Sequence, residues 1–71
     1  MRKRRRYKGY ELLIDNDYII SGIRIMFPKQ ILYPHKWCEE LNDWIDVSNV
    51  IKFDNFKKEY GTKYRMLDRS L

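Results

Sequence analysis

Short apolar segments rich in β-branched residues, each followed closely by residues that favour turns, constrain the fold of this sequence most strongly. Such segments span residues 9–15, 18–26, 30–33, 43–47 and 50–53. Asp15-Asn16-Asp17, Pro28-Lys29 and Ser48-Asn49 separate several of them. Segments of this length and composition, bounded by such residues, are typical of β-strands. The pattern therefore predicts a mainly β fold of five short strands.

A chain of 71 residues has room for one domain with one modest core. Closing the five strands into a barrel would leave no exposed sheet edge, which favours a small SH3-like barrel over residues 9–53. Gly22 predicts a bulge or a close backbone approach in the second strand. Asp54 is expected to cap a short helix within residues 54–61 that Gly61 ends, and residues 62–71 are expected to form a tail.

The charge is unevenly distributed along the chain, whose net charge is +5. Residues 2–8 contain six basic residues and no acidic one, whereas residues 9–53 contain seven acidic residues and four basic ones. A block of like charge usually stays solvated, so residues 1–8 are predicted to be a flexible basic arm. Its cations are suited to phosphate neutralisation, and this predicts RNA or DNA as a partner. They are Arg2, Lys3, Arg4, Arg5, Arg6 and Lys8. A localisation signal, a ribosome-facing tail and a merely solvated terminus are the alternatives.

Aromatic residues make up 15% of the sequence, which is a high fraction. Trp44 stands in an alternating polar and apolar segment, and we expect it to fill the centre of the barrel. Trp37 lies in the polar stretch 36–42, predicted to be a loop, where stacking on a base and packing are both plausible roles. Tyr18, Tyr33 and Trp37 are the candidates for an exposed aromatic surface that stacks on unpaired bases or encloses a methylated ammonium.

Several function classes find no support in the sequence. Cys38 is the single cysteine, so it can form no intramolecular disulfide, and this favours an intracellular compartment. His35 and Cys38 have metal-ligand spacing, but a structural zinc site needs four ligands and the sequence has no further Cys or His. The same scarcity argues against an enzyme. Neither a signal peptide nor a membrane-spanning segment is expected, and no metal or cofactor is predicted.

The stretch from Leu32 to Val50 resembles the most distinctive part of chromo-barrel (Tudor-knot) domains of the MYST and MRG types of chromatin protein. Trp37 matches an aromatic of the family pattern, Leu41 matches a leucine, and Asn42-Asp43-Trp44-Ile45 matches an Asp-Glu-Trp-Ile element. Pro34 stands where the family has a tyrosine, and Tyr33 stands where it has a histidine. The resemblance implies an SH3-like fold and a link to chromatin, whereas the change at Pro34 removes one ring of the usual methyl-lysine cage.

Together these features predict a non-enzymatic binding module that engages nucleic acid through the basic arm and exposed rings. It would be nuclear in a eukaryote and cytoplasmic otherwise. The acidic middle of the chain supports a different class, a protein–protein interaction factor such as a small virus- or phage-encoded inhibitor of a host protein. A methyl-lysine reader is the third possibility, implied by the resemblance.

Overall fold

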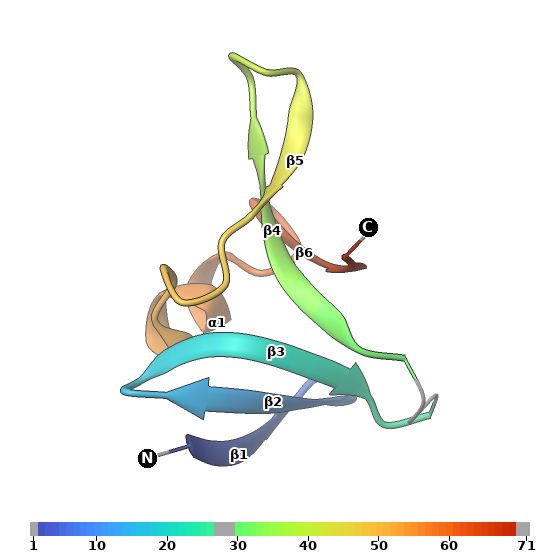
Figure 1. Cartoon of the computed structure of the whole chain (residues 1–71), viewed down its shortest axis with the longest axis vertical. Coiled ribbons are helices and arrows are strands. Elements are labelled where there is room, and N and C mark those ends of the chain that lie inside the picture. The colour runs from blue at the N-terminus through green and yellow to red at the C-terminus, as the bar shows by residue number, and fades with distance from the viewer. Residues whose placement is uncertain (1, 27–29, 70–71) are drawn as a thin grey trace.

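The computed structural model describes residues 2–26 and 30–69. The expected Pro28-Lys29 turn lies outside these residues. Six strands and one helix are present in the described part of the chain (Figure 1): β1 Arg2–Tyr7, β2 Tyr10–Asp15, β3 Tyr18–Arg24, β4 Leu32–Cys38, β5 Asp43–Asp46, α1 Phe53–Glu59 and β6 Tyr64–Asp68. No described helix is both long and apolar enough to span a membrane.

The strands form one open antiparallel sheet in the order β1-β2-β3-β4-β5, and β6 pairs with the other edge of β4. The mainly β fold with one short helix is therefore confirmed. The strand number differs from the expected five because residues 2–7 and 64–68, predicted to be an arm and part of a tail, form β1 and β6. The expected strand at residues 50–53 is reduced to a single bridge between Lys52 and Tyr18.

The basic segment is a strand because it folds back on β2 as a hairpin. Lys8 and Gly9 make the two-residue turn, with φ values of 45° and 82°. Two consecutive positive φ angles are typical of the type I′ turn, whose twist suits a tight hairpin. The prediction of an unpaired arm was wrong because it weighed the charge of the segment and overlooked this turn.

Close packing around Gly22 confirms the expected backbone approach in β3. A Cβ atom there would lie 2.6 Å from Cε of Met66 and 2.7 Å from Cδ2 of Leu12. The bulge in this hairpin lies elsewhere, at the register shift between Leu13 and Ile14 of β2. Glycine at this point therefore leaves room for the side chains of Met66 and Leu12 against β3.

Strand β4 is longer than expected and passes through Pro34. The expected strand covered residues 30–33 and so ended before the proline, and residues 36–42 were predicted to form a loop, but β4 continues to Cys38 and only the residues after it turn. Pro34 lacks an amide proton, yet its carbonyl oxygen accepts a hydrogen bond from the Val47 amide at 2.9 Å. Because β4 continues to Cys38, the hairpin that it forms with β5 extends beyond the rest of the sheet (Figure 1).

The N-cap of the helix lies two residues earlier than the sequence suggested. Lys52 is its N-cap and provides no side-chain hydrogen bond, so the prediction that Asp54 caps the helix was wrong. Asp54 instead lies in the first turn, where a carboxylate is favourable. Gly61, with φ of 92°, follows the end of the helix as predicted.

Phe56, which is 1% exposed, is the largest fully buried side chain. The core residues around it come from most elements of the body, and they are Leu12, Ile14, Ile19, Leu32, Ile51, Phe53, Tyr64 and Met66. Trp44 is not among them, so its predicted central position was wrong. It lies on the β4–β5 hairpin, which projects along the long axis away from the body (Figure 1).

Candidate nucleic-acid interface

Strand β1 lies at the edge of the sheet, and its alternation directs the basic side chains to two faces. Arg2, Arg4 and Arg6 stand opposite Asp15, Leu13 and Glu11 of β2. Lys3 and Arg5 stand opposite the buried residues Ile14 and Leu12, so they lie on the rim of the core. Since side chains of a strand alternate, one face of β1 carries three arginines and the other carries a lysine and an arginine.

The outer face is the more exposed of the two. The guanidinium of Arg4 contacts the Glu11 carboxylate at 2.6 Å, and 72% of the Arg4 side chain is exposed. Arg6 is exposed and makes no ion pair with any other residue within 2–26 or 30–69. An exposed ion pair such as that of Arg4 contributes at most about 1 kcal/mol, so it can open when a phosphate approaches.

On the rim of the core, two cations cover the ring of Phe53. The guanidinium carbon of Arg5 lies 5.2 Å from the ring centroid, and Nζ of Lys57 lies 5.0 Å from it. Arg5 also approaches Asp17 at 3.7 Å. A pocket of about 270 Å³ opens between these groups, lined by Arg5, Asp17, Lys52, Phe53 and Asp54.

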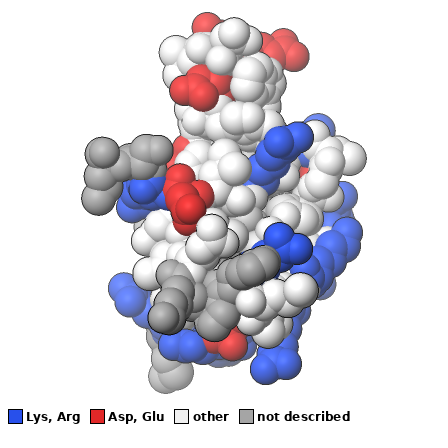
Figure 2. All heavy atoms as spheres, turned by 90° about the vertical axis from the view of Figure 1, so that its right-hand side faces the viewer, with Lys and Arg blue, Asp and Glu red and all other residues white. Residues whose placement is uncertain are grey.

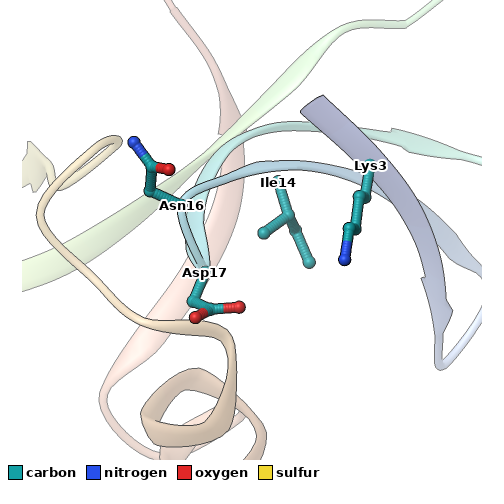
Figure 3. Close-up of a pocket in the computed structure, with 4 residues that line it drawn as sticks. All are labelled: Lys3, Ile14, Asn16 and Asp17. Carbon is teal, nitrogen blue, oxygen red and sulfur yellow. The ribbon is translucent and has the colours of Figure 1, made fainter. Parts of the chain in front are cut away.

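A second pocket of about 270 Å³ lies at the other end of β1, lined by Lys3, Ile14, Asn16 and Asp17. Figure 3 shows the Lys3 and Ile14 side chains extending from neighbouring strands toward the same side as the Asp17 carboxylate, while the Asn16 amide points away. Asn16 and Asp17 reach this pocket from the β2–β3 turn, where both have positive φ angles. Lys3 and Asp17 give this pocket mixed charge.

Tyr7 holds the basic strand against the body. Its ring packs edge to face against Phe53, Phe56 and Tyr60, with centroid distances of 6.2, 5.8 and 6.0 Å. Its hydroxyl donates a hydrogen bond to the Lys57 carbonyl oxygen at 3.1 Å. Burial and, to a smaller extent, Tyr10 raise the pKa of Tyr60 above its usual value. The ring contacts and the hydrogen bond of Tyr7 fix β1 against the helix.

The predicted aromatic surface is divided among separate places. Tyr18 begins β3, and Nζ of Lys52 lies 5.8 Å from its ring centroid. Tyr33 lies on β4, where the guanidinium of Arg69 is 4.0 Å from its ring centroid. Trp37 lies further along β4 and packs against Trp44 with a centroid distance of 5.4 Å. The three rings therefore have different neighbours and do not form one stacking surface.

The predicted site residues also separate by position. The molecule measures 33 × 24 × 21 Å, and the β4–β5 hairpin and β1 lie toward opposite ends of the longest axis (Figure 1). Figure 2 shows acidic and uncharged atoms on the projecting hairpin and many Lys and Arg side chains around the body. The structure thus brings the cations of β1 together, but it does not bring Trp37 to them.

His35 and Cys38 do not form a paired site. They are three residues apart on β4, so their side chains leave opposite faces of the strand. His35 is 8% exposed, and its Nδ1 donates a hydrogen bond to the Tyr33 carbonyl oxygen at 2.7 Å. Among residues 2–26 and 30–69, no group of three or more His, Cys, Asp or Glu side chains is arranged to hold a metal ion.

Lys52 and Lys57 join the basic side of the body although sequence analysis did not select them. Both lie at or within α1, which packs Phe53 and Phe56 inward. The signal was present in the segment from Lys52 to Lys58, where two phenylalanines three residues apart predict a buried helix face and leave the lysines that flank them at its edges.

A scan against protein-family models, a search of curated proteins and a search of solved structures each found no significant match.

Proposed function

We propose that the protein binds nucleic acid by its backbone phosphates and that the outer face of β1 is the contact surface. The observation that supports this most is the row formed by Arg2, Arg4 and Arg6 on an edge strand. No other strand within the described residues covers that edge. A fixed row of arginines loses less conformational freedom on binding than a mobile arm would.

The spacing of the row suits a regular series of phosphates. Alternate residues of an antiparallel strand are about 6.8 Å apart, so the three guanidinium groups can reach separate phosphates. Arginine can also donate two parallel hydrogen bonds to one phosphate. Lys8 follows Arg6 on the hairpin turn and extends the cationic surface.

The proposed contact is sequence-independent because this surface offers no free aromatic ring. Tyr7 is engaged with the core, and both tryptophans lie on the hairpin. Phosphate contacts position a protein on nucleic acid but do not read its sequence. We therefore expect similar affinities for duplexes of different sequence. Trp37, a candidate from the sequence, is not part of the proposed interface.

The relation to chromo-barrel domains and the SH3-like barrel remains part of the proposal. It is supported by the segment from Leu32 to Val50, which forms the β4–β5 hairpin with Trp37 directly opposite Trp44. A methyl-lysine cage receives less support, because Lys52 lies over Tyr18 and Arg69 lies over Tyr33. We place phosphate binding first for this reason.

The decisive experiment compares two triple variants that remove the same charge. Arg2→Gln, Arg4→Gln and Arg6→Gln change β1, whereas Lys36→Gln, Lys63→Gln and Arg65→Gln change exposed cations elsewhere. Fluorescence anisotropy with a labelled duplex is measured over a range of salt concentrations. Each phosphate contact contributes about −0.9 to the slope of log K against log salt. The β1 variant should therefore lose about 2.7 units of slope, and the control should keep its slope.

Equal slopes for the two triple variants would show that net charge, not the β1 row, governs binding, and the proposal would fail. Absence of binding by the unmodified protein at low salt would also overturn it. Intrinsic tryptophan emission gives an independent check. Since both tryptophans lie on the hairpin, we expect the duplex to leave their emission unchanged.

A further inference from the structure

The β4–β5 hairpin presents an aromatic surface at the end of the molecule away from β1. Trp37 and Trp44 are direct partners across the two strands, and their rings meet edge to face at an interplanar angle of 69°. Trp37 is 40% exposed. β6 pairs with β4 only as far as Lys36, so no described strand other than β5 flanks β4 beside Trp37.

Carboxylates are concentrated on this hairpin and beside Trp44. Residues 36–46 contain four acidic residues and one lysine. A hollow of about 380 Å³ between the hairpin and β6 adds a fifth carboxylate, that of Asp68, and its lining consists of His35, Asp43, Trp44, Asp46, Leu67, Asp68 and Arg69. Asp43 and Asp68 make no ion pair with another residue in the described ranges. Phosphates would be repelled here.

The chain itself shows which chemical group this face accommodates. The guanidinium of Arg65 lies 5.1 Å from the centroid of a Trp44 ring. That of Arg69 lies 4.0 Å from the Tyr33 ring centroid and donates to the Asp46 carboxylate, with Nε at 2.7 Å from Oδ2. In both cases a guanidinium lies over a ring on this face, and in the second a carboxylate completes the contact.

We infer that the hairpin is a second binding surface, which takes an arginine-bearing segment of a partner protein. The partner guanidinium would enter the hollow beside Trp44 and pair with Asp43 or Asp68, in an arrangement similar to that of Arg69 with Tyr33 and Asp46. Charge complementarity selects this occupant, because the hairpin is acidic in a protein whose net charge is +5. The inference is independent of phosphate binding by β1, which involves neither tryptophan.

The test uses a short blocked peptide with two arginines flanking a leucine, and the same peptide with citrulline in place of both arginines as the control. Citrulline keeps the planar shape and removes the charge. Binding to the whole chain is followed by tryptophan emission and by the indole N–H signals in NMR spectra. Only the arginine peptide should change both, because the two tryptophans of the chain are partners on the hairpin.

Variants locate the contact. Asp43→Asn with Asp68→Asn should weaken the arginine peptide at least about fivefold, as should Trp44→Leu, consistent with one charge-assisted or cation–π contact. Asp54→Asn with Glu59→Gln removes the same charge from α1 and should leave affinity unchanged. Equal binding of the two peptides, or equal effects of the two acidic pairs of substitutions, would overturn the inference.

A second copy of the chain is the competing occupant, because β1 itself carries arginines. Sedimentation velocity distinguishes it. A concentration-dependent dimer that disappears in the Asp43→Asn, Asp68→Asn variant would assign the hairpin to self-association and overturn the assignment to a partner protein. A monomer that binds the arginine peptide would support that assignment.

Discussion

The two ends of this small molecule use aromatic residues and charge in opposite ways. In the body, Phe56 and its neighbouring rings are buried, and the surface around them is basic. On the hairpin, Trp37 and Trp44 lie at the surface among carboxylates. The body gains its stability from a core shared by α1 and most strands, whereas the tip of the hairpin is a two-stranded ribbon, which has little stability of its own.

The difference shows that a large ring does not by itself mark a core. The rings of the body meet others from several elements, as Tyr7 does with Phe53 and Tyr60. The tryptophans meet each other and Arg65 but lie outside the buried cluster. Rings of the first kind build the core, and rings of the second kind pack against each other outside it.

The strongest test of this comparison truncates one ring at each end. Phe56→Ala should cost about 3–5 kcal/mol of unfolding free energy, because it empties the centre of the core. A domain of this size has only about 4–10 kcal/mol in total, so this variant should be largely unfolded on mild heating. Trp44→Ala should cost no more than about 1.5 kcal/mol, since it removes mainly the contact with Trp37.

Urea denaturation followed by far-ultraviolet circular dichroism measures both changes. Phe56→Leu is the milder companion variant, which should remain folded and lie between the other two in stability. If Trp44→Ala were as destabilising as Phe56→Ala, the hairpin would belong to the cooperative core and the comparison would not hold.

A smaller effect is expected at Gly22, where the body and the strand that carries the hairpin meet. Gly22 is paired with Leu32, the first residue of β4. Gly22→Ala places a methyl group against Met66 and Leu12, and such overpacking costs about 1–3 kcal/mol. Because Cε of Met66 is the nearest atom, Gly22→Ala combined with Met66→Val should recover part of the loss.

Thermal unfolding of the two single variants and the double variant measures this coupling. Independent effects of the two substitutions would contradict the close contact between Gly22 and Met66. Gly22 thus tests whether the region where β3 meets β4 is as tightly packed as the core.

The sequence predicted the strands that carry an apolar segment bounded by turn residues. It did not predict the strands that form because they pair with another part of the chain. β2 and β3 were predicted because Leu12, Ile14 and Ile19 stand among turn residues. β1 was missed because its charges indicated a solvated segment. Its structure depends instead on pairing with β2 and on the packing of Tyr7 against rings of residues 53–60. β6 was missed for the same reason, since Tyr64 and Met66 become core residues only when β4 pairs with them.

The candidate site was predicted in part. The basic residues of the proposed interface were selected from the sequence as a group, but their arrangement as an ordered row could not be predicted without the Lys8-Gly9 turn. The alternation of Asp43-Trp44-Ile45-Asp46 predicted a strand, and β5 is one. Alternation does not reveal whether a strand extends past its neighbours, and for this reason the burial of Trp44 was predicted wrongly.

The smallest expected effect concerns the contact that ties the hairpin to β6. Burial alone would raise the pKa of Asp46, but hydrogen bonds from Ser48 and the interaction with Arg69 outweigh it and lower the pKa below its usual value of 3.8. A carboxyl whose pKa is lower in the folded state stabilises the fold above its unfolded pKa, and this contribution disappears as pH falls through the folded pKa. The hairpin should therefore loosen below about pH 4.

Arg69→Gln should raise the pKa of Asp46 toward its usual value, so loosening begins at a higher pH. The pair is partly exposed, and its loss should cost only about 0.2–1 kcal/mol at neutral pH. NMR titration of the Asp46 carboxyl and of the indole N–H signals measures both effects. Arg65→Gln is the matched control, since Arg65 lies on the same strand but over Trp44. An unchanged Asp46 titration in Arg69→Gln would mean that Ser48 alone holds the carboxylate, and that β6 does not secure the hairpin electrostatically.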